Sequence, residues 1–371
     1  MPANPSPDTP ALRDASRPSV ALVTGITGQD GGYLTALLLS RGYEVHGLAR
    51  DPARLDRSRL AGTGADLNRR LVLHRCDIGT EDDMDGLLAR IMPDEVYNLA
   101  AQTHIQTSFK DPAATTNVNA TGAVKLLSAV SRLGRGHVRY FQASSSEMFG
   151  DACGRVQNEE TPLHPLNPYA VSKHAAFEAT VNFREAYRLH TSNGILFNHE
   201  SPFRAPSFVT RKISQSVAAS HVFGPETLRL GNLDVRRDWG HARDYVEGMW
   251  KMLQQDTPDD YVLASGKNHS VREFVEIAFS EIGRSISWEG EGVEEKGFDA
   301  ATGELLVEVD PAFFRPTDLS ATLGDARKAR EKLGWCPKAS FRDLVAEMVA
   351  ADIARAEEQA RAGAGVSGSS D

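Results

Sequence analysis

Three glycines between an apolar run and an amphipathic one constrain this chain more than any other segment. Val20–Val23 has the continuous apolar character of a strand buried on both faces, and the leucines of Leu34–Leu38 recur at helical spacing. In such a strand–turn–helix unit, Gly25 permits the tight turn, Gly28 lets a pyrophosphate approach the backbone, and Gly31 lets the helix pack on the strand. The unit predicts a dinucleotide whose pyrophosphate lies at the helix N-terminus, where N–H groups and the helix dipole favour negative charge.

Strand and helix signals alternate after this unit, which is typical of a parallel, doubly wound sheet. The expected strands are Glu44–Ala49, Leu71–Asp77, Glu95–Ala101, Val138–Ser144 and Gly194–Asn198. Beyond them the pattern changes to loops and to helices expected at about 209–222, 271–282 and 341–354. The predicted fold class is α/β, a Rossmann-type doubly wound parallel sheet with a smaller C-terminal α/β substrate-binding domain.

Composition sets the expected domain boundaries at both ends. Residues 1–18 are rich in Pro and small polar residues, and residues 357–371 end in a Gly/Ser-rich run, so both are expected to be disordered tails. We expect the dinucleotide-binding Rossmann domain at 19–200, with about 240–265 returning to it, and a mainly substrate-binding domain at 201–356.

Bulk properties exclude several classes of function. The net charge of -9 argues against nucleic acid as a partner, and no apolar run approaches the roughly 20 residues that a membrane helix needs. Three cysteines without a C-x-x-C pair predict neither a disulfide framework nor a zinc site, and the histidines show no metal-ligand spacing. We therefore expect a cytoplasmic protein with reduced thiols and no metal.

A tyrosine and a lysine lie one helical turn apart, at Tyr169 and Lys173, just after Pro168. A lysine cation beside a tyrosine stabilises phenolate, so the phenol can exchange a proton with a sugar hydroxyl while hydride moves to a nicotinamide. By itself this spacing is common, and a solvated pair on a helix surface would be the better interpretation of it. Downstream of the glycine turn, the catalytic interpretation is favoured.

A hydroxyl and carboxylate cluster, Ser144–Glu147, ends the fifth expected strand, where a parallel sheet presents side chains to its ligand crevice. A serine hydroxyl there can share a hydrogen bond with the reacting oxygen. Glu147 offers a base that can remove a carbon-bound proton and return it as an acid. The alternative is a cluster that only caps the next turn.

The residues after the second strand bear on the choice of cofactor. Arg50 stands where an acidic residue would hold the ribose of NAD, and Arg54, Arg57 and Arg59 follow, so NADP is favoured over NAD. Asp51 weakens that preference. Two further segments are expected at the cofactor: Asp77, at the adenine amino group, and Leu99–Thr103, along the nicotinamide ribose.

Basic residues gather in the C-terminal part of an acidic chain. With Asn198–Pro202 they suggest a pyrophosphate clamp, although some must be ordinary surface charges. They are Arg204, Arg211, Lys212, Arg236, Arg237 and Arg315.

Together these motifs closely resemble the GDP-mannose 4,6-dehydratase family, an extended branch of the short-chain dehydrogenases/reductases to which the Gly-x-x-Gly-x-x-Gly spacing points. The resemblance runs from Val20 to about Asp352. The signatures are Thr24–Gly31, Asn182–Tyr187, Gly194–Pro202, Phe208–Ile213, Arg237–Gly240 and Phe314–Thr317.

The resemblance implies an internal redox cycle on GDP-mannose. NADP+ takes hydride from C4 while Tyr169, supported by Lys173, accepts the hydroxyl proton; Glu147 removes the C5 proton and helps to expel water; and hydride returns to C6. Ser145 replaces the family's threonine as the hydroxyl partner. The resemblance implies cofactor contacts at Gly25, Ile26, Thr27, Gly28, Gln29, Asp30, Arg50, Asp77, Ile78, Leu99, Ala100, Ala101, Thr103, Tyr169, Lys173, His199 and Arg204. It implies substrate contacts at Ser108, Ser146, Asn198, Val209, Lys212, Arg237 and Arg315.

Some positions depart from the family pattern. Only Arg50 remains of its Arg-Arg-Ser-Ser run, Thr116–Gly122 follows a more general nucleotide-sugar pattern, and no glycine follows Arg204. A 4,6-dehydratase of another GDP-sugar, such as a GDP-heptose, therefore stays open. A GDP-4-keto-sugar reductase has no use for Glu147, and the intact catalytic set argues against a non-catalytic NADP sensor. The fold family implies a homodimer or homotetramer.

Overall fold

The computed structural model describes residues 17–54, 57–66, 70–80, 83–134, 136–151, 155–224, 226–314 and 319–367. Most of the predicted N-terminal tail therefore lies outside the described residues.

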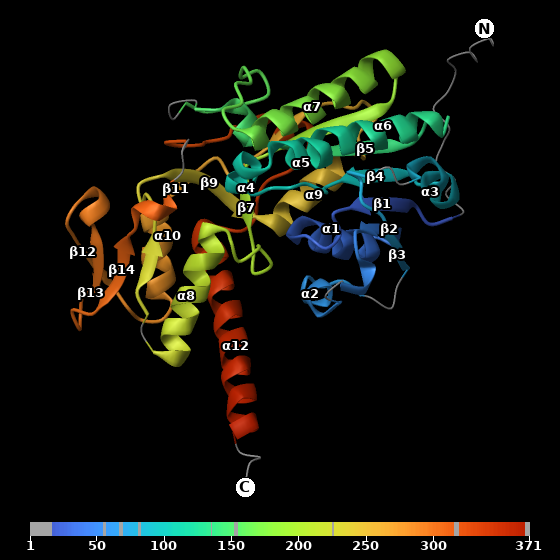
Figure 1. Ribbon diagram of the computed structural model, residues 1–371. Helices are drawn as coiled ribbons and strands as arrows, with labels where there is room; N and C mark the ends of the chain where they lie inside the picture. Colours follow the sequence, from blue (N-terminus) through green and yellow to red (C-terminus); the bar gives the residue numbers. More distant parts are fainter. Residues whose placement is uncertain are drawn as a thin grey trace. The chain divides into compact units, whose positions relative to one another are not determined.

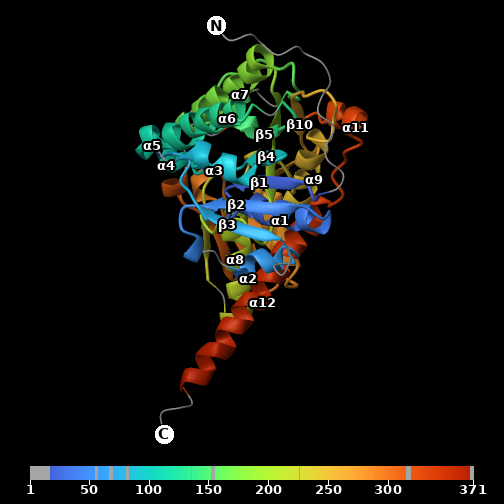
Figure 2. The same cartoon turned by 90° about the vertical axis from the view of Figure 1, so that its right-hand side faces the viewer.

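A seven-stranded sheet confirms the predicted fold class, with the strand order β10-β6-β5-β4-β1-β2-β3. Strands β2 and β4 both pair with β1 in parallel, β3 extends the sheet beyond β2, and β5 extends it beyond β4. Figure 2 shows β4, β1, β2 and β3 one below another. The strands are β1 (Val20–Thr24), β2 (Glu44–Ala49), β3 (Leu71–Arg75), β4 (Glu95–Asn98), β5 (Arg139–Ser145), β6 (His190–Leu196) and β10 (Tyr261–Leu263).

The order of this sheet determines where a ligand crevice forms. The chain runs outward from β1 through β2 to β3 and then crosses back to β4 on the other side of β1. In open α/β sheets, ligands bind outside the carboxyl ends of the strands at such a switch point. The glycine turn follows β1 directly, so it lies at this edge of the sheet.

Helices connect the strands and cover the sheet (Figure 1), with α6 and α1 on opposite sides of it. Helix α6 packs beside α3 and α7, and α1 packs beside α2. These connecting helices are α1 (Gln29–Ser40), α2 (Arg57–Gly62), α3 (Met84–Ile91), α4 (Ile105–Lys110), α5 (Pro112–Thr116), α6 (Gly122–Arg132), α7 (Pro168–Tyr187) and α9 (Ala242–Met252).

The chain divides into two compact units, each with its own hydrophobic core. Unit 1 consists of the described residues up to Ser144 together with Asn167–Gly194 and Met249–Tyr261. Unit 2 consists of Ser145–Leu166, Ile195–Gly248 and the residues from Val262 onward. In unit 1, the fully buried Leu22 of β1 and Val96 of β4 share a core with Leu126 of α6. The apolar runs that predicted the strands therefore form the centre of this unit.

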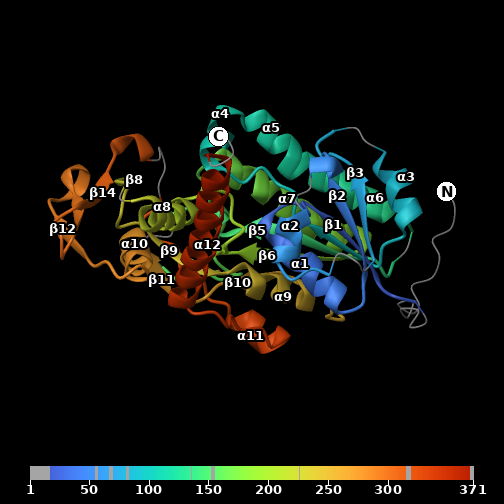
Figure 3. The same cartoon turned by 90° about the horizontal axis from the view of Figure 1, so that it is seen from below.

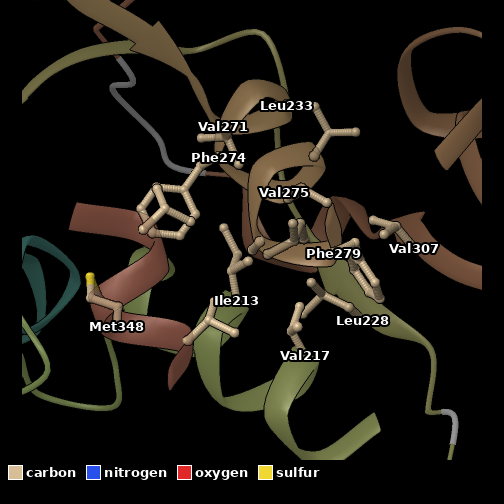
Figure 4. Close-up of a cluster of buried hydrophobic side chains, with 14 of the residues drawn as sticks. Ile213, Val217, Leu228, Leu233, Val271, Phe274, Val275, Phe279, Val307 and Met348 are labelled. Atoms are coloured by element: carbon tan, nitrogen blue, oxygen red, sulfur yellow. The ribbon is translucent and has the colours of Figure 1, made fainter. Parts of the chain in front are cut away.

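Unit 2 is built around three helices, α8 (Val209–Phe223), α10 (Val271–Ser280) and α12 (Phe341–Ser367). They pack together (Figure 3) and enclose a core in which Ile213, Phe274 and Met348 are fully buried (Figure 4). Two smaller sheets complete the unit, with strand orders β11-β9-β7 and β12-β13-β14-β8. Their strands are β7 (Asn198–Glu200), β8 (Leu228–Leu230), β9 (Arg236–His241), β11 (Asn268–Ser270), β12 (Ile286–Glu289), β13 (Lys296–Asp299) and β14 (Leu305–Val309), and a short helix, α11 (Arg327–Leu333), precedes α12.

Helix α12 continues past position 357, where the sequence predicts the start of a disordered tail. Residues 350–361 consist mostly of Ala, Glu, Gln and Arg, which are strong helix formers. Their propensity accounts for the helix that the structure describes from 357 up to Ser367.

A buried ion pair joins α8 to α12 and offers a test of the core of unit 2. Arg211 donates to Asp352, whose carboxylate also accepts the Ser214 hydroxyl at 2.7 Å, and the Arg211 and Asp352 side chains are only 6% and 3% exposed. Asp352→Ala leaves the guanidinium buried without its counter-ion, so we expect the free energy of unfolding to fall by about 3–5 kcal/mol. Urea denaturation followed by tryptophan fluorescence measures this.

The matched control is Arg342→Ala, on the same helix as Asp352. It removes an exposed ion pair between Arg342 and Glu281. We expect this variant to stay within about 0.5 kcal/mol of the wild type. Equal losses in the two variants would contradict a specific role for the buried pair.

Candidate active site

The glycine turn after β1 is built by close backbone packing. Gly25 has φ +69°, and a Cβ on it would lie 2.8 Å from the Ala100 nitrogen. A Cβ on Gly31 would lie 2.4 Å from the Gly25 oxygen, so α1 can begin against the turn only with glycine there. Gly28 differs, because it is exposed and its Cβ would meet only the Gly25 oxygen, at 3.2 Å. The open backbone at Gly28 fits the approach of a pyrophosphate.

The hydroxyl of Thr24, the last residue of β1, ties this turn to the end of β4. It accepts hydrogen bonds from the backbone nitrogens of Leu99 and Ala100, at 3.0 and 2.9 Å, and donates to the Asn98 side chain at 2.8 Å. The predicted cofactor residues at 25–30 and 99–101 therefore come from two neighbouring strand ends that share one buried hydroxyl.

Helix α7 carries the tyrosine and lysine pair. Asn167 caps the helix by accepting a hydrogen bond from the Ala170 nitrogen at 2.8 Å, and Pro168 occupies the first turn. Lys173 is 4% exposed; its ammonium donates to the Ala143 carbonyl at 2.8 Å and lies 5.9 Å from the centre of the Tyr169 ring. Burial lowers the pKa of Lys173 to about 8, against the opposing charge of Asp30. The pair is therefore not a solvated surface pair.

A π-helical turn, Asn117–Thr121, holds the start of α7 in place. The Asn119 amide donates to the Gln102 carbonyl at 3.0 Å and to the Ser172 hydroxyl at 2.9 Å, and Ser172 donates to the Tyr169 carbonyl at 2.7 Å. Such turns are rare in proteins overall, but many of those that occur are at functional sites. Sequence reasoning singled out this segment for its pattern, but it did not identify Asn119 as the contact between the β4 loop and α7.

The loop after β2 exposes Arg50 and engages the neighbouring acidic residue. The Asp51 carboxylate accepts a hydrogen bond from the Ala53 nitrogen at 3.2 Å, as in an Asx turn. The side chains of Arg54, Arg57 and Arg59 lie outside the described residues.

The other predicted contacts of unit 1 differ in exposure. Asp77 accepts a hydrogen bond from the Gly79 nitrogen at 3.0 Å, whereas Ile78 is buried in the core. Thr103 is exposed, and Ser108 is fully buried with its hydroxyl donating to the Ile105 carbonyl at 2.6 Å. Ile78 therefore contributes to the core of unit 1, and the Ser108 hydroxyl bonds to a carbonyl of its own helix.

The hydroxyl and carboxylate cluster lies in unit 2 from Ser145 onward, whereas Ser144 is the last residue of the first segment of unit 1. The Ser145 hydroxyl accepts a hydrogen bond from the Glu147 nitrogen at 3.2 Å and so caps the short helix Ser146–Phe149. Ser146 is buried, and Glu147 is partly exposed. Ser145 therefore caps the next turn, and because its hydroxyl acts as an acceptor there, it keeps a hydrogen that it can donate.

Basic residues of unit 2 fall into two groups. Arg211 pairs with Asp352, and Arg236 pairs with Glu273 at 2.9 Å, so these two predicted clamp residues serve internal ion pairs instead. Arg204 also pairs internally, with Glu200 at 3.1 Å, and it stacks on Phe208. Spacing alone could not separate the pairs of Arg211 and Arg236 from ligand contacts, because their partners lie far away in the sequence.

The remaining predicted contact residues that the structure describes in unit 2 lie on β7, β9 and α8. The Lys212 ammonium lies 3.4 Å from the centre of the Phe313 ring, and burial lowers its pKa. The buried Arg237 donates to the Leu319 carbonyl at 2.7 Å, and the buried His199 donates from Nδ1 to the Phe197 carbonyl and stacks on Tyr245. Asn198 and Val209 are partly exposed, and Arg315 lies outside the described residues.

The described chain lacks two kinds of feature. No group of three or more His, Cys, Asp or Glu side chains in it could hold a metal ion. None of its helices has the length and apolar character needed to cross a membrane.

Comparison with known proteins places these features in one family. The family model described as GDP-mannose 4,6 dehydratase matches residues 22–348. A GDP-mannose 4,6-dehydratase of Sinorhizobium fredii is 51% identical over 90% of this chain and 96% of its own length. The GDP-mannose 4,6 dehydratase of Drosophila melanogaster is 47% identical over 91% of this chain and 87% of its own length.

Solved structures share the fold at lower sequence identity. A Thermus thermophilus UDP-glucose 4-epimerase complex with NAD is 24% identical, with a TM-score of 0.74 over 90% of this chain and 98% of the epimerase. The Pseudomonas aeruginosa RMD complexed with NADPH is also 24% identical, with a TM-score of 0.70 over 91% of this chain and 100% of RMD.

Two glycine variants separate packing from ligand approach. Gly31→Ala places a methyl group against backbone atoms, so we expect a loss of about 1–3 kcal/mol in the free energy of unfolding. Gly28→Ala should lower that free energy by only about 0.5–1 kcal/mol, because alanine is a poorer N-cap than glycine. It should weaken binding of a nicotinamide dinucleotide at least roughly tenfold, because the methyl group occupies the open side of the turn. Urea denaturation and isothermal titration calorimetry measure the two effects. Unchanged binding in Gly28→Ala would rule out the pyrophosphate at this position.

Proposed function

The chain belongs to the GDP-mannose 4,6-dehydratase family, and from this premise we propose that it converts GDP-α-D-mannose to GDP-4-keto-6-deoxy-D-mannose and water. The observation that carries the proposal is identity of 51% and 47% to two 4,6-dehydratases over about nine-tenths of the chain. The presence of Ser145, Glu147, Tyr169 and Lys173 in one chain supports it, since each supplies a step that this conversion needs.

The reaction removes water without net oxidation. A nicotinamide, when bound, supplies reversible hydride transfer: it accepts hydride from C4 and returns it to C6. At C4, Tyr169 as phenolate takes the hydroxyl proton while the C4–O bond becomes a carbonyl, and the Ser145 hydroxyl donates a hydrogen bond to that oxygen. The buried ammonium of Lys173, one helical turn from Tyr169, stabilises the phenolate.

Glu147 acts in the elimination of water, a step that a simple dehydrogenase does not need. The C4 ketone acidifies the C5 proton, and the Glu147 carboxylate removes it. The protonated carboxyl group then delivers a proton to the C6 hydroxyl, which leaves as water and gives a C5–C6 double bond. Transfer of hydride to C6 and of a proton to C5, which balances the proton that Tyr169 took from the C4 hydroxyl, completes the product, so that C4 ends oxidised and C6 reduced.

We assign the 2'-phosphate of NADP to Arg50. Arg50 is exposed at the end of β2, while the neighbouring Asp51 carboxylate accepts a backbone hydrogen bond in its own loop. A guanidinium suits a phosphate by bidentate, charge-assisted hydrogen bonds. His199 and Arg204 are assigned to the cofactor, and the GDP-sugar contacts are assigned to Ser108, Ser146, Asn198, Val209, Lys212, Arg237 and Arg315.

The proposal includes a cytoplasmic homodimer or homotetramer. Exposed apolar side chains on α7 support an assembly through this helix, because Val171 and Tyr187 are 51% and 57% exposed. An exposed free thiol, Cys336, is consistent with a reducing compartment.

Incubation with GDP-mannose tests the function directly. We expect a 4-keto product by mass spectrometry, with a mass loss of one water and no net change in NADPH absorbance. Protein depleted of cofactor should regain turnover at a lower concentration of NADP+ than of NAD+. Net NADPH oxidation would contradict the dehydratase assignment, and turnover of a GDP-heptose without turnover of GDP-mannose would redirect the substrate.

Glu147→Gln tests the elimination step. The amide cannot act as a base at C5, so we expect C4 oxidation to persist and product formation to fall at least roughly a hundredfold. Exchange of the C5 proton with deuterated water, followed by NMR, should be lost in the variant. Full product formation by Glu147→Gln would remove Glu147 from the mechanism.

A further inference from the structure

A chain of buried side chains runs beneath the carboxyl ends of β1, β4 and β5 within unit 1. Thr24 donates to the Asn98 oxygen at 2.8 Å, and the Asn98 amide donates to the Gln142 oxygen at 2.9 Å. The Gln142 amide donates to the Ala143 carbonyl at 3.1 Å, the same carbonyl that accepts the Lys173 ammonium at 2.8 Å. Thr24, Asn98 and Gln142 are each at most 2% exposed.

The direction of every hydrogen bond in this chain follows from its chemistry. The Ala143 carbonyl can only accept, so Gln142 must present its NH2 group to it, beside the Lys173 ammonium that donates to the same oxygen. The Gln142 oxygen then faces Asn98 and also accepts the Tyr140 hydroxyl at 2.9 Å. Both ends of the Gln142 amide are thus satisfied in one orientation only. Such networks hold groups in place when every member is satisfied.

We propose that Gln142 is a positioning residue for the reaction, which holds the Lys173 ammonium in place through the shared carbonyl of Ala143. The inference rests on the proposed function, because it gives Lys173 its purpose there. Through Asn98 and Thr24, Gln142 also links Lys173 to the backbone of Leu99 and Ala100, where the cofactor is expected.

The ionisable groups that face Lys173 are few among the described residues. Asp30 of α1 stabilises its charge, Tyr169 lies on its own helix, and Tyr140 of β5 lies behind Gln142 with a pKa raised by burial. Burial lowers the pKa of Lys173 to about 8, so its ionisation is sensitive to a hydrogen-bond acceptor near neutral pH. A hydrogen bond from the ammonium favours the charged form, so loosening that bond lowers the pKa further.

The test compares Gln142→Met with Tyr140→Phe. Methionine keeps the length of the side chain and removes both hydrogen-bonding ends, whereas Tyr140→Phe removes one bond to Gln142 and leaves the bond from Gln142 to Ala143. For Gln142→Met we expect kcat to fall roughly ten- to a hundredfold, with KM for GDP-mannose within about twofold of the wild type. Tyr140→Phe should keep kcat within about twofold.

The pKa of Lys173 is measured directly, on protein labelled with 13C at lysine Cε. Its NMR signal is identified by its loss in Lys173→Arg. We expect the pKa in Gln142→Met to lie about half to one pH unit below that of the wild type, and the pKa in Tyr140→Phe to be unchanged. The alkaline limb of kcat/KM should move to lower pH by the same amount. If Gln142→Met is too unstable to assay, the double variant Gln142→Met/Tyr140→Phe is titrated instead. It also removes the Tyr140 hydroxyl, which the single variant leaves buried without its acceptor.

A Lys173 pKa that is unchanged or raised in Gln142→Met would overturn the inference, as would an equal shift in Tyr140→Phe. The titration needs no turnover. If the wild type makes no 4-keto product and the titration still shifts, the proposed function fails and the link from Gln142 to Lys173 stands. If product forms and the titration does not shift, only the link fails.

Discussion

The buried hydroxyl of Thr24 is the contact on which the rest of the site in unit 1 depends. Its single oxygen accepts from two successive backbone nitrogens after β4 and donates to Asn98. It thereby fixes the carboxyl ends of β1 and β4 relative to each other at the point where the sheet reverses its order. An unpaired hydroxyl in this position would cost about 1–3 kcal/mol, so the sheet edge is held by the requirement that buried polar groups be satisfied.

The same requirement organises α7. The Lys173 ammonium is almost fully buried, and a buried charge is tolerated only with a hydrogen-bond acceptor within reach. The Ala143 carbonyl provides that acceptor, Gln142 orients the carbonyl, and Asn119 fixes the start of the helix through Ser172. The strand ends and the helix are therefore coupled by polar contacts, while the aliphatic core beneath them supplies most of the burial energy.

Unit 2 uses its charges differently. Arginines at 204, 211 and 236 neutralise acidic side chains of the same unit, and two of those ion pairs connect secondary structure elements that are remote in sequence. Lys212 and Arg237 make contacts of another kind, with an aromatic ring and with a backbone carbonyl. A positive residue in an acidic chain is thus weak evidence for a phosphate ligand until its partner is known.

The sequence by itself determined the fold class, the positions of the central strands along the chain, the glycine turn and the family. All of these follow from local periodicity or from contiguous motifs. The expected strand Glu44–Ala49, for example, coincides with β2 at both ends. Tertiary structure alone decided which cations are paired inside the protein, which asparagine holds α7, and that Thr24, Asn98 and Gln142 form one chain. The physical reason is separation along the chain: Thr24 meets Asn98 across 74 positions and Arg211 meets Asp352 across 141, and no local pattern encodes such partners.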